Sequence, residues 1–109
     1  MKIKKVKVGG GKHCIVACII NSQKTLALID TGANVSCFHK KYNTGLTFTT
    51  FLKIGESNFA ILNTNGNWNY SGLIDKLKRT YNEDITAILG MDILDGSIIN
   101  LKKNTIVLK

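Results

Sequence analysis

The feature that most limits the fold is a succession of short apolar runs, each about as long as a β-strand, with turn-forming residues between them. Runs of this length and composition are typical of strands, and glycine, asparagine and serine between them are typical of turns. The predicted strands are 2–8, 13–20, 25–30, 46–54, 58–63, 86–89, 98–101 and 104–108. The chain has 109 residues, no proline and no linker-like stretch, so we expect one all-β domain over residues 1–109.

Helical structure is expected in two places. Residues 73–81 have room for one or two helical turns. Asp92 occupies a position typical of a helix N-cap and is followed by Ile93 and Leu94. The sequence therefore predicts one short helix near the C-terminus.

An acidic residue follows one of the predicted strands directly. The apolar run 26–29 reads as a strand buried on both faces, and it ends at Asp30, Thr31 and Gly32. The chain thus carries a carboxylate out of the core into a tight turn, where glycine supplies backbone freedom. The same three residue types are also ordinary turn formers, so the tripeptide alone leaves both a catalytic and a purely structural interpretation open.

A second segment repeats this pattern, because the apolar run 86–89 leads into Gly90 and then into Met91-Asp92-Ile93-Leu94. Together, Asp-Thr-Gly-Ala at 30–33 and Ile-Leu-Gly-Met-Asp-Ile-Leu at 88–94 resemble the retropepsins, the aspartic proteases of retroviruses, retrotransposons and plant pararetroviruses. The tail 99–108 is similar to the closing hairpin of retrotransposon-type members and of cellular retropepsin-like domains. The resemblance runs from about residue 13 to 108, and the stretch 38–85 matches nothing residue by residue.

The resemblance implies a single-lobed, closed β-barrel of the acid-protease fold. Asp30 would be the catalytic acid, and Thr31 would turn its hydroxyl inward to lock two active-site loops across a dimer. Gly32 and Ala33 would let the backbone approach substrate, and Gly90 would underlie the active-site loop. No cofactor and no metal are expected.

The resemblance also implies a flap over a long, apolar cleft that takes an extended peptide. Its tip, by offset from Asp30, would fall near Ile54, Gly55 and Glu56, in a hairpin between apolar strands. Residues 63–67, followed by Trp68, are a competing flap tip. Both positions stay open.

The number of suitable carboxylates predicts a homodimer. Aspartic-acid catalysis requires two carboxyls that share one proton, and the chain has one Asp-Thr-Gly. Asp92 is the only serious rival, and its setting favours a cap. The second acid is therefore expected to be Asp30 of another copy across a two-fold axis. The termini, roughly 3–8 and 105–108, would interleave with those of the partner, and the substrate would be a peptide or polyprotein.

The formal net charge of +8 keeps another class of function open. A basic balance can indicate nucleic-acid binding, but no helix-turn-helix, zinc-finger or aromatic RNA-binding motif accompanies it. A basic nucleic-acid-binding barrel and a catalytically silent peptide-binding or dimerisation module remain the alternatives to a protease. Nonspecific contact with nucleic acid is expected in either case.

Location and cysteine chemistry follow from simpler patterns. No apolar run approaches the ~20 residues needed to span a bilayer, and residues 1–5 lack the apolar stretch of a signal peptide. We expect a cytoplasmic protein that is not secreted, with free thiols at Cys14, Cys18 and Cys37. A zinc site that adds His13 and His39 is disfavoured because the spacings match no common zinc pattern.

Overall fold

The computed structural model describes residues 4–8, 11–42, 49–62, 70–100 and 105–107. The strands are β1 (Lys4–Val8), β2 (Gly11–Ile20), β3 (Gln23–Ile29), β4 (Cys37–Phe38), β5 (Thr49–Ile54), β6 (Ser57–Leu62), β7 (Ile85–Leu89), β8 (Ile98–Asn100) and β9 (Thr105–Val107). The helices are the 3-10 helix η1 (Lys40–Tyr42), α2 (Ser71–Tyr81) and α3 (Met91–Leu94). All eight predicted strands are thus confirmed within the described residues.

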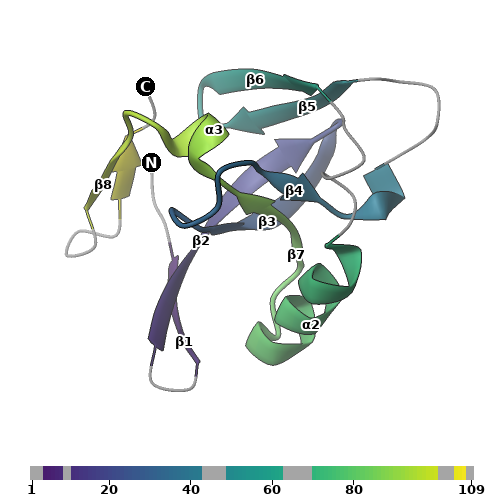
Figure 1. Cartoon of the computed structure of the whole chain (residues 1–109), viewed down its shortest axis with the longest axis vertical. Helices are drawn as coiled ribbons and strands as arrows, with labels where there is room; N and C mark the ends of the chain where they lie inside the picture. Colours follow the sequence, from purple (N-terminus) through teal and green to yellow (C-terminus); the bar gives the residue numbers. More distant parts are fainter. Residues whose placement is uncertain (1–3, 9–10, 43–48, 63–69, 101–104, 108–109) are drawn as a thin grey trace.

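Seven of these strands form one curled sheet (Figure 1). Its order is β4-β7-β3-β2-β5-β6, and β1 pairs with the N-terminal part of β2, residues 11–15. β3 and β7 run parallel, whereas the other pairs are antiparallel. The parallel pair places the C-terminal ends of β3 and β7 side by side, and the two sequence motifs lie at these ends.

The β2–β3 turn shows how local chemistry sets the register. Asn21 and Ser22 both have positive φ, of 46° and 70°, as the favoured two-residue hairpin turn requires, and asparagine tolerates this conformation well. The Asn21 side-chain oxygen also accepts a hydrogen bond from the Phe51 backbone N–H at 2.9 Å, and the Asn21 backbone N–H donates to the Phe51 carbonyl at 2.9 Å. This turn therefore holds β5 against the edge of β2.

Two apolar clusters cover the two faces of the sheet, because successive residues of β2 point to opposite sides. Val16, Cys18 and Ile20 face the larger cluster, over which β5, β6 and α3 fold. Ile15 faces the smaller cluster, which α2 covers with the fully buried Ile74. All five residues of β7 are buried, since this strand lies between both clusters.

The helices differ in part from the sequence predictions. The short C-terminal helix is confirmed as α3, but its N-cap is Gly90 and not Asp92, which lies in the first turn. The helix α2 has 11 residues and ends where Asn82 adopts the left-handed conformation, with its N–H bonded to the Lys78 carbonyl. The sequence analysis missed β4, because two residues are too short for a periodic pattern. Among the described residues, no helix is long and apolar enough to cross a membrane.

The first and last described strands, β1 and β9, each pair with a neighbouring strand of the same chain. β1 forms a hairpin with β2, and β9 pairs with β8 in a small sheet of its own. Ile106 is buried in the larger cluster, and Val107 is 59% exposed. β9 has no second neighbour among the described strands, which leaves one edge of the β8–β9 hairpin unpaired.

Candidate active site

Asp30 lies where β3 leaves the sheet. Its backbone N–H donates to the Leu89 carbonyl of β7 at 2.9 Å, so the residue is fixed at the end of the parallel pair. Its side chain is exposed, and the carboxylate Oδ1 accepts a hydrogen bond from the Gly32 N–H at 3.0 Å. The Ala33 N–H donates to the Asp30 carbonyl at 3.2 Å. The acid is therefore presented to solvent from a closed, hydrogen-bonded turn.

The loop after Asp30 lies directly on the junction between β7 and α3. The first N–H groups of α3 are satisfied by this loop: Met91 donates to the Ala33 carbonyl at 2.7 Å, and Asp92 donates to the Asn34 carbonyl at 3.1 Å. A Cβ atom built on Gly90 would lie 2.7 Å from the carbonyl carbon and oxygen of Val35. Backbone atoms cannot yield as side-chain tips do, so only glycine allows this close approach.

Ser36 and Asp92 fix the same loop through hydrogen bonds between their side chains and the backbone. The Ser36 hydroxyl donates to Asp92 Oδ1 at 2.6 Å and accepts the Gly90 N–H at 2.9 Å, and the serine is fully buried. The Ser36 backbone N–H lies 3.0 Å from both carboxylate oxygens. Asp92 is thus a brace for the loop that carries Asp30. The sequence analysis missed this pair, although a serine between apolar residues six positions after Asp30 was a usable signal.

A hollow of about 360 Å³ opens beside Asp30. Its walls come from the loop after Asp30, from β4 and β7, and from the start of α2. The residues that line it are Asp30, Ala33, Asn34, Val35, Cys37, Tyr70, Leu73 and Ile88. Val35, Tyr70 and Leu73 are about half exposed (54%, 50% and 46%), so apolar surface faces solvent next to the carboxylate.

The other sequence-predicted site residues are not all gathered at this hollow. Thr31 is exposed, and its hydroxyl makes no hydrogen bond to another described residue. Ile54 is 1% exposed in the larger core cluster, whereas Gly55 and Glu56 form the exposed two-residue turn between β5 and β6. Gly55 lines a different hollow, against β2 and β3. The competing flap tip at 63–67 lies outside the described residues.

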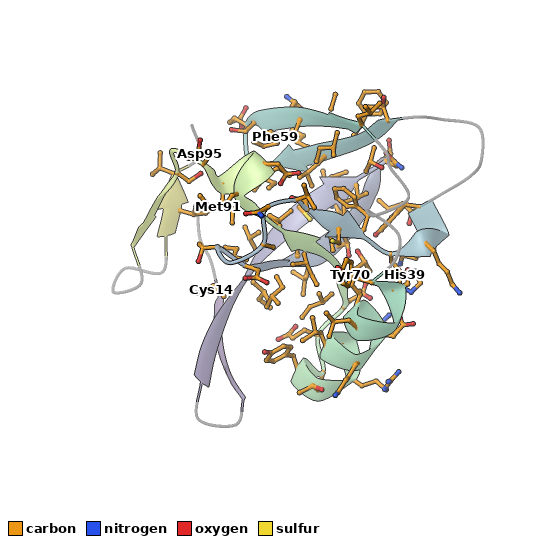
Figure 2. The ribbon with its side chains drawn as sticks, in the orientation of Figure 1. Cys14, His39, Phe59, Tyr70, Met91 and Asp95 are labelled. Carbon is orange, nitrogen blue, oxygen red and sulfur yellow. The ribbon has the colours of Figure 1, made fainter. Side chains whose placement is uncertain are left out.

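Cys37 and His39 do not form a nucleophile–base pair. Burial, with the carboxylates of Asp92 and Asp30 nearby, raises the pKa of the Cys37 thiol, so it stays protonated. The thiol contacts the Val35 carbonyl at 3.9 Å. The His39 Nε2 atom instead lies 2.9 Å from Asp75 Oδ1 on α2, and the ring lies beside the first turns of this helix (Figure 2).

None of Cys14, Cys18 and Cys37 forms a disulfide bond in the described part of the chain. Cys14 and Cys18 pack with the larger core cluster from one face of β2, where they act as small hydrophobic residues. Within the described part of the chain, no group of three His, Cys, Asp or Glu side chains is arranged to hold a metal ion.

Comparison with known proteins identifies the fold. No protein-family model matches the sequence, and no curated protein matches it. Among solved structures, the chain is similar to the retroviral protease-like domain of Ddi1 from Leishmania major, with a TM-score of 0.58 and 19% sequence identity over 95% of this chain and 88% of that one. The chain therefore has the all-β, retropepsin-like fold, built here as a curled half-barrel sheet with a short C-terminal helix.

Proposed function

We propose that the chain is an aspartic endopeptidase that acts as a homodimer on extended peptide or polyprotein substrates. The observation that carries this proposal is the setting of Asp30. Its exposed carboxylate lies at the rim of an apolar hollow, on a loop that Gly90, Ser36 and Asp92 hold rigidly against the core. Such rigid support is what a catalytic group requires, because the reacting atoms must be held in place.

The chemistry needs two such carboxyls. One carboxylate takes a proton from a water molecule, whose oxygen then attacks the peptide carbonyl carbon, while the other carboxyl donates its proton to the carbonyl oxygen. The tetrahedral intermediate collapses when the amide nitrogen is protonated and the C–N bond breaks. Asp30 is half of this machinery.

The remaining acids favour a second copy as the source of the other half. Both oxygens of Asp92 accept hydrogen bonds from Ser36. Asp75 bonds to His39, and Asp84 pairs with Lys78 at 2.8 Å. A two-fold axis that brings two copies of Asp30 together supplies the missing carboxyl. The unpaired edge of the β8–β9 hairpin, with the exposed Val107, is a surface through which two copies would associate.

The test is cleavage of a fluorogenic peptide library at mildly acid pH by the wild-type chain and by two matched variants. Asp30→Asn is expected to lose several orders of magnitude in rate, because an essential acid–base group is removed. Asp95→Asn is the control, since Asp95 is an exposed acid just after α3. It should cleave normally. A statine-type inhibitor should block the wild type.

Equal activity of the Asp30→Asn and Asp95→Asn variants would refute the proposal. A chain that binds apolar peptides but cleaves none at any concentration would indicate the silent peptide-binding module instead.

A further inference from the structure

The helix α2 forms one wall of the hollow beside Asp30. Leu73, in the first turn of α2, and Tyr70, which precedes the helix, face Ala33 and Val35 of the active-site loop across this hollow. Both are about half exposed, so their apolar surface is available to a ligand. Ile88 of β7 lies in the same lining.

The position of this wall is fixed by the neighbouring, buried face of the helix. Ile74, next to Leu73 in sequence, is fully buried and packs in the same cluster as Ile88 and Cys37. Ile88 and Cys37 also line the hollow, so a shift of α2 would move Leu73 directly and disturb these two residues through Ile74. Because close-packed interiors transmit such shifts, the size of the hollow depends on where α2 sits.

Two polar ties anchor the first turns of α2 to the segment after β4. The Lys40 backbone N–H donates to the Ser71 hydroxyl at 2.8 Å, and His39 Nε2 lies 2.9 Å from Asp75 Oδ1. The Lys41 N–H donates to the other ring nitrogen, His39 Nδ1, at 3.1 Å. Nδ1 therefore carries no proton, and Nε2–H is the donor to the Asp75 carboxylate.

We propose that α2 is the specificity element of this site. The hollow accepts a bulky apolar side chain of the substrate next to the scissile bond, Leu73 sets the size of that side chain, and the His39–Asp75 pair is a positioning device that holds Leu73 in place. This inference rests on the proposed protease function. A hollow of this volume is within the range of ligand-binding pockets.

The first experiment uses peptides that differ only in the residue before the scissile bond: alanine, leucine, phenylalanine or tryptophan. Leu73→Ala should raise the kcat/KM ratio of tryptophan to leucine peptides by about tenfold, the size expected for reshaping an apolar pocket. Leu62→Ala is the matched control, because Leu62 is an exposed leucine on β6 (68%) that does not line this hollow. An unchanged ratio in Leu73→Ala would overturn the inference.

The second experiment tests the positioning role. His39→Ala should raise KM more than it lowers kcat and should shift the same peptide ratio, whereas His39→Gln retains a donor for Asp75 and should recover part of the effect. Combining His39→Ala with Asp75→Ala should add little further, since both remove one interaction. Additive effects, or a changed melting temperature with an unchanged peptide ratio, would contradict the positioning role.

A binding measurement separates this inference from the proposed function. In the Asp30→Asn background, fluorescence anisotropy of the same labelled peptides reports occupancy of the hollow without cleavage. If Leu73→Ala shifts binding toward tryptophan while the wild type cleaves nothing, the pocket is supported and the protease proposal fails. If the wild type cleaves but Leu73→Ala changes neither binding nor cleavage preference, only the pocket inference fails.

Discussion

Gly90→Ala is the substitution for which the structure gives the sharpest expectation. The added Cβ would lie 2.7 Å from the Val35 carbonyl carbon and oxygen and 2.8 Å from the Ala33 carbonyl oxygen. Gly90 has φ of −105°, which alanine adopts without strain, so the penalty is steric alone. Since all three atoms belong to backbone, the cost should reach about 3 kcal/mol, the upper end of the range for overpacking.

Thermal and urea unfolding measure this cost, and peptide cleavage measures its effect on Asp30. A loss of about 3 kcal/mol lowers the melting temperature of a domain this size by roughly 10 to 15 °C. Activity should fall further than stability does, because the displaced backbone is the loop that carries the carboxylate. The residual folded fraction can be assayed at low temperature to separate the two effects.

Gly72→Ala is the control, because a Cβ on Gly72 meets nothing within 4 Å and the residue lies in α2. It should stabilise the chain by about 0.5 kcal/mol through the higher helix propensity of alanine. A Gly90→Ala variant as stable and active as Gly72→Ala would refute the view that the two segments are packed backbone to backbone.

Three further outcomes are expected. Ser36→Ala should lower the free energy of unfolding by about 1–3 kcal/mol in urea, because it removes hydrogen bonds to Asp92 and to the buried Gly90 N–H. An unchanged urea midpoint would contradict this role of Ser36. Burial raises the pKa of Cys18 to about 12 from an ordinary value of 9.0, so above pH 9 the unfolded chain ionises first and stability falls as pH rises toward 12. Cys18→Ala should flatten that alkaline decline, and parallel curves for the two proteins would exclude this cause. Residues 1–29 contain six lysines and no acid, so we expect weak binding to single-stranded RNA that falls linearly with the logarithm of salt concentration; salt-independent binding would contradict it.

Most of the fold was accessible from sequence because strand formation here is a local signal. Alternating or continuous apolar runs bounded by turn residues located every strand of more than two residues. The Asn21-Ser22 turn was recognisable because its residue types suit positive φ. β4 was missed, since Cys37 and Phe38 are defined by pairing with β7, a contact that no local pattern encodes.

The site was accessible only in part, for a similar reason. The sequence placed Asp30 and Gly90 at the ends of two strands, and the parallel pairing of β3 with β7 brings these ends together. The prediction that Asp92 is a helix cap was wrong. An acid near a helix start is usually a cap, whereas here the Asp92 carboxylate bonds to Ser36, 56 positions earlier in the chain. The wall formed by α2 was not predicted, because the stretch 38–85 carried no residue-level resemblance.

The most direct test of the account mixes wild-type chains with Asp30→Asn chains. Both are kept well above the dimer dissociation constant, and cleavage is measured at constant wild-type concentration while sedimentation confirms exchange. If each active site needs Asp30 from both copies, an equal amount of the variant should reduce activity to about half, because only a quarter of randomly formed dimers then carry two aspartates. Activity that stays unchanged as the variant is added, with mixed dimers present, would contradict the paired-carboxyl site.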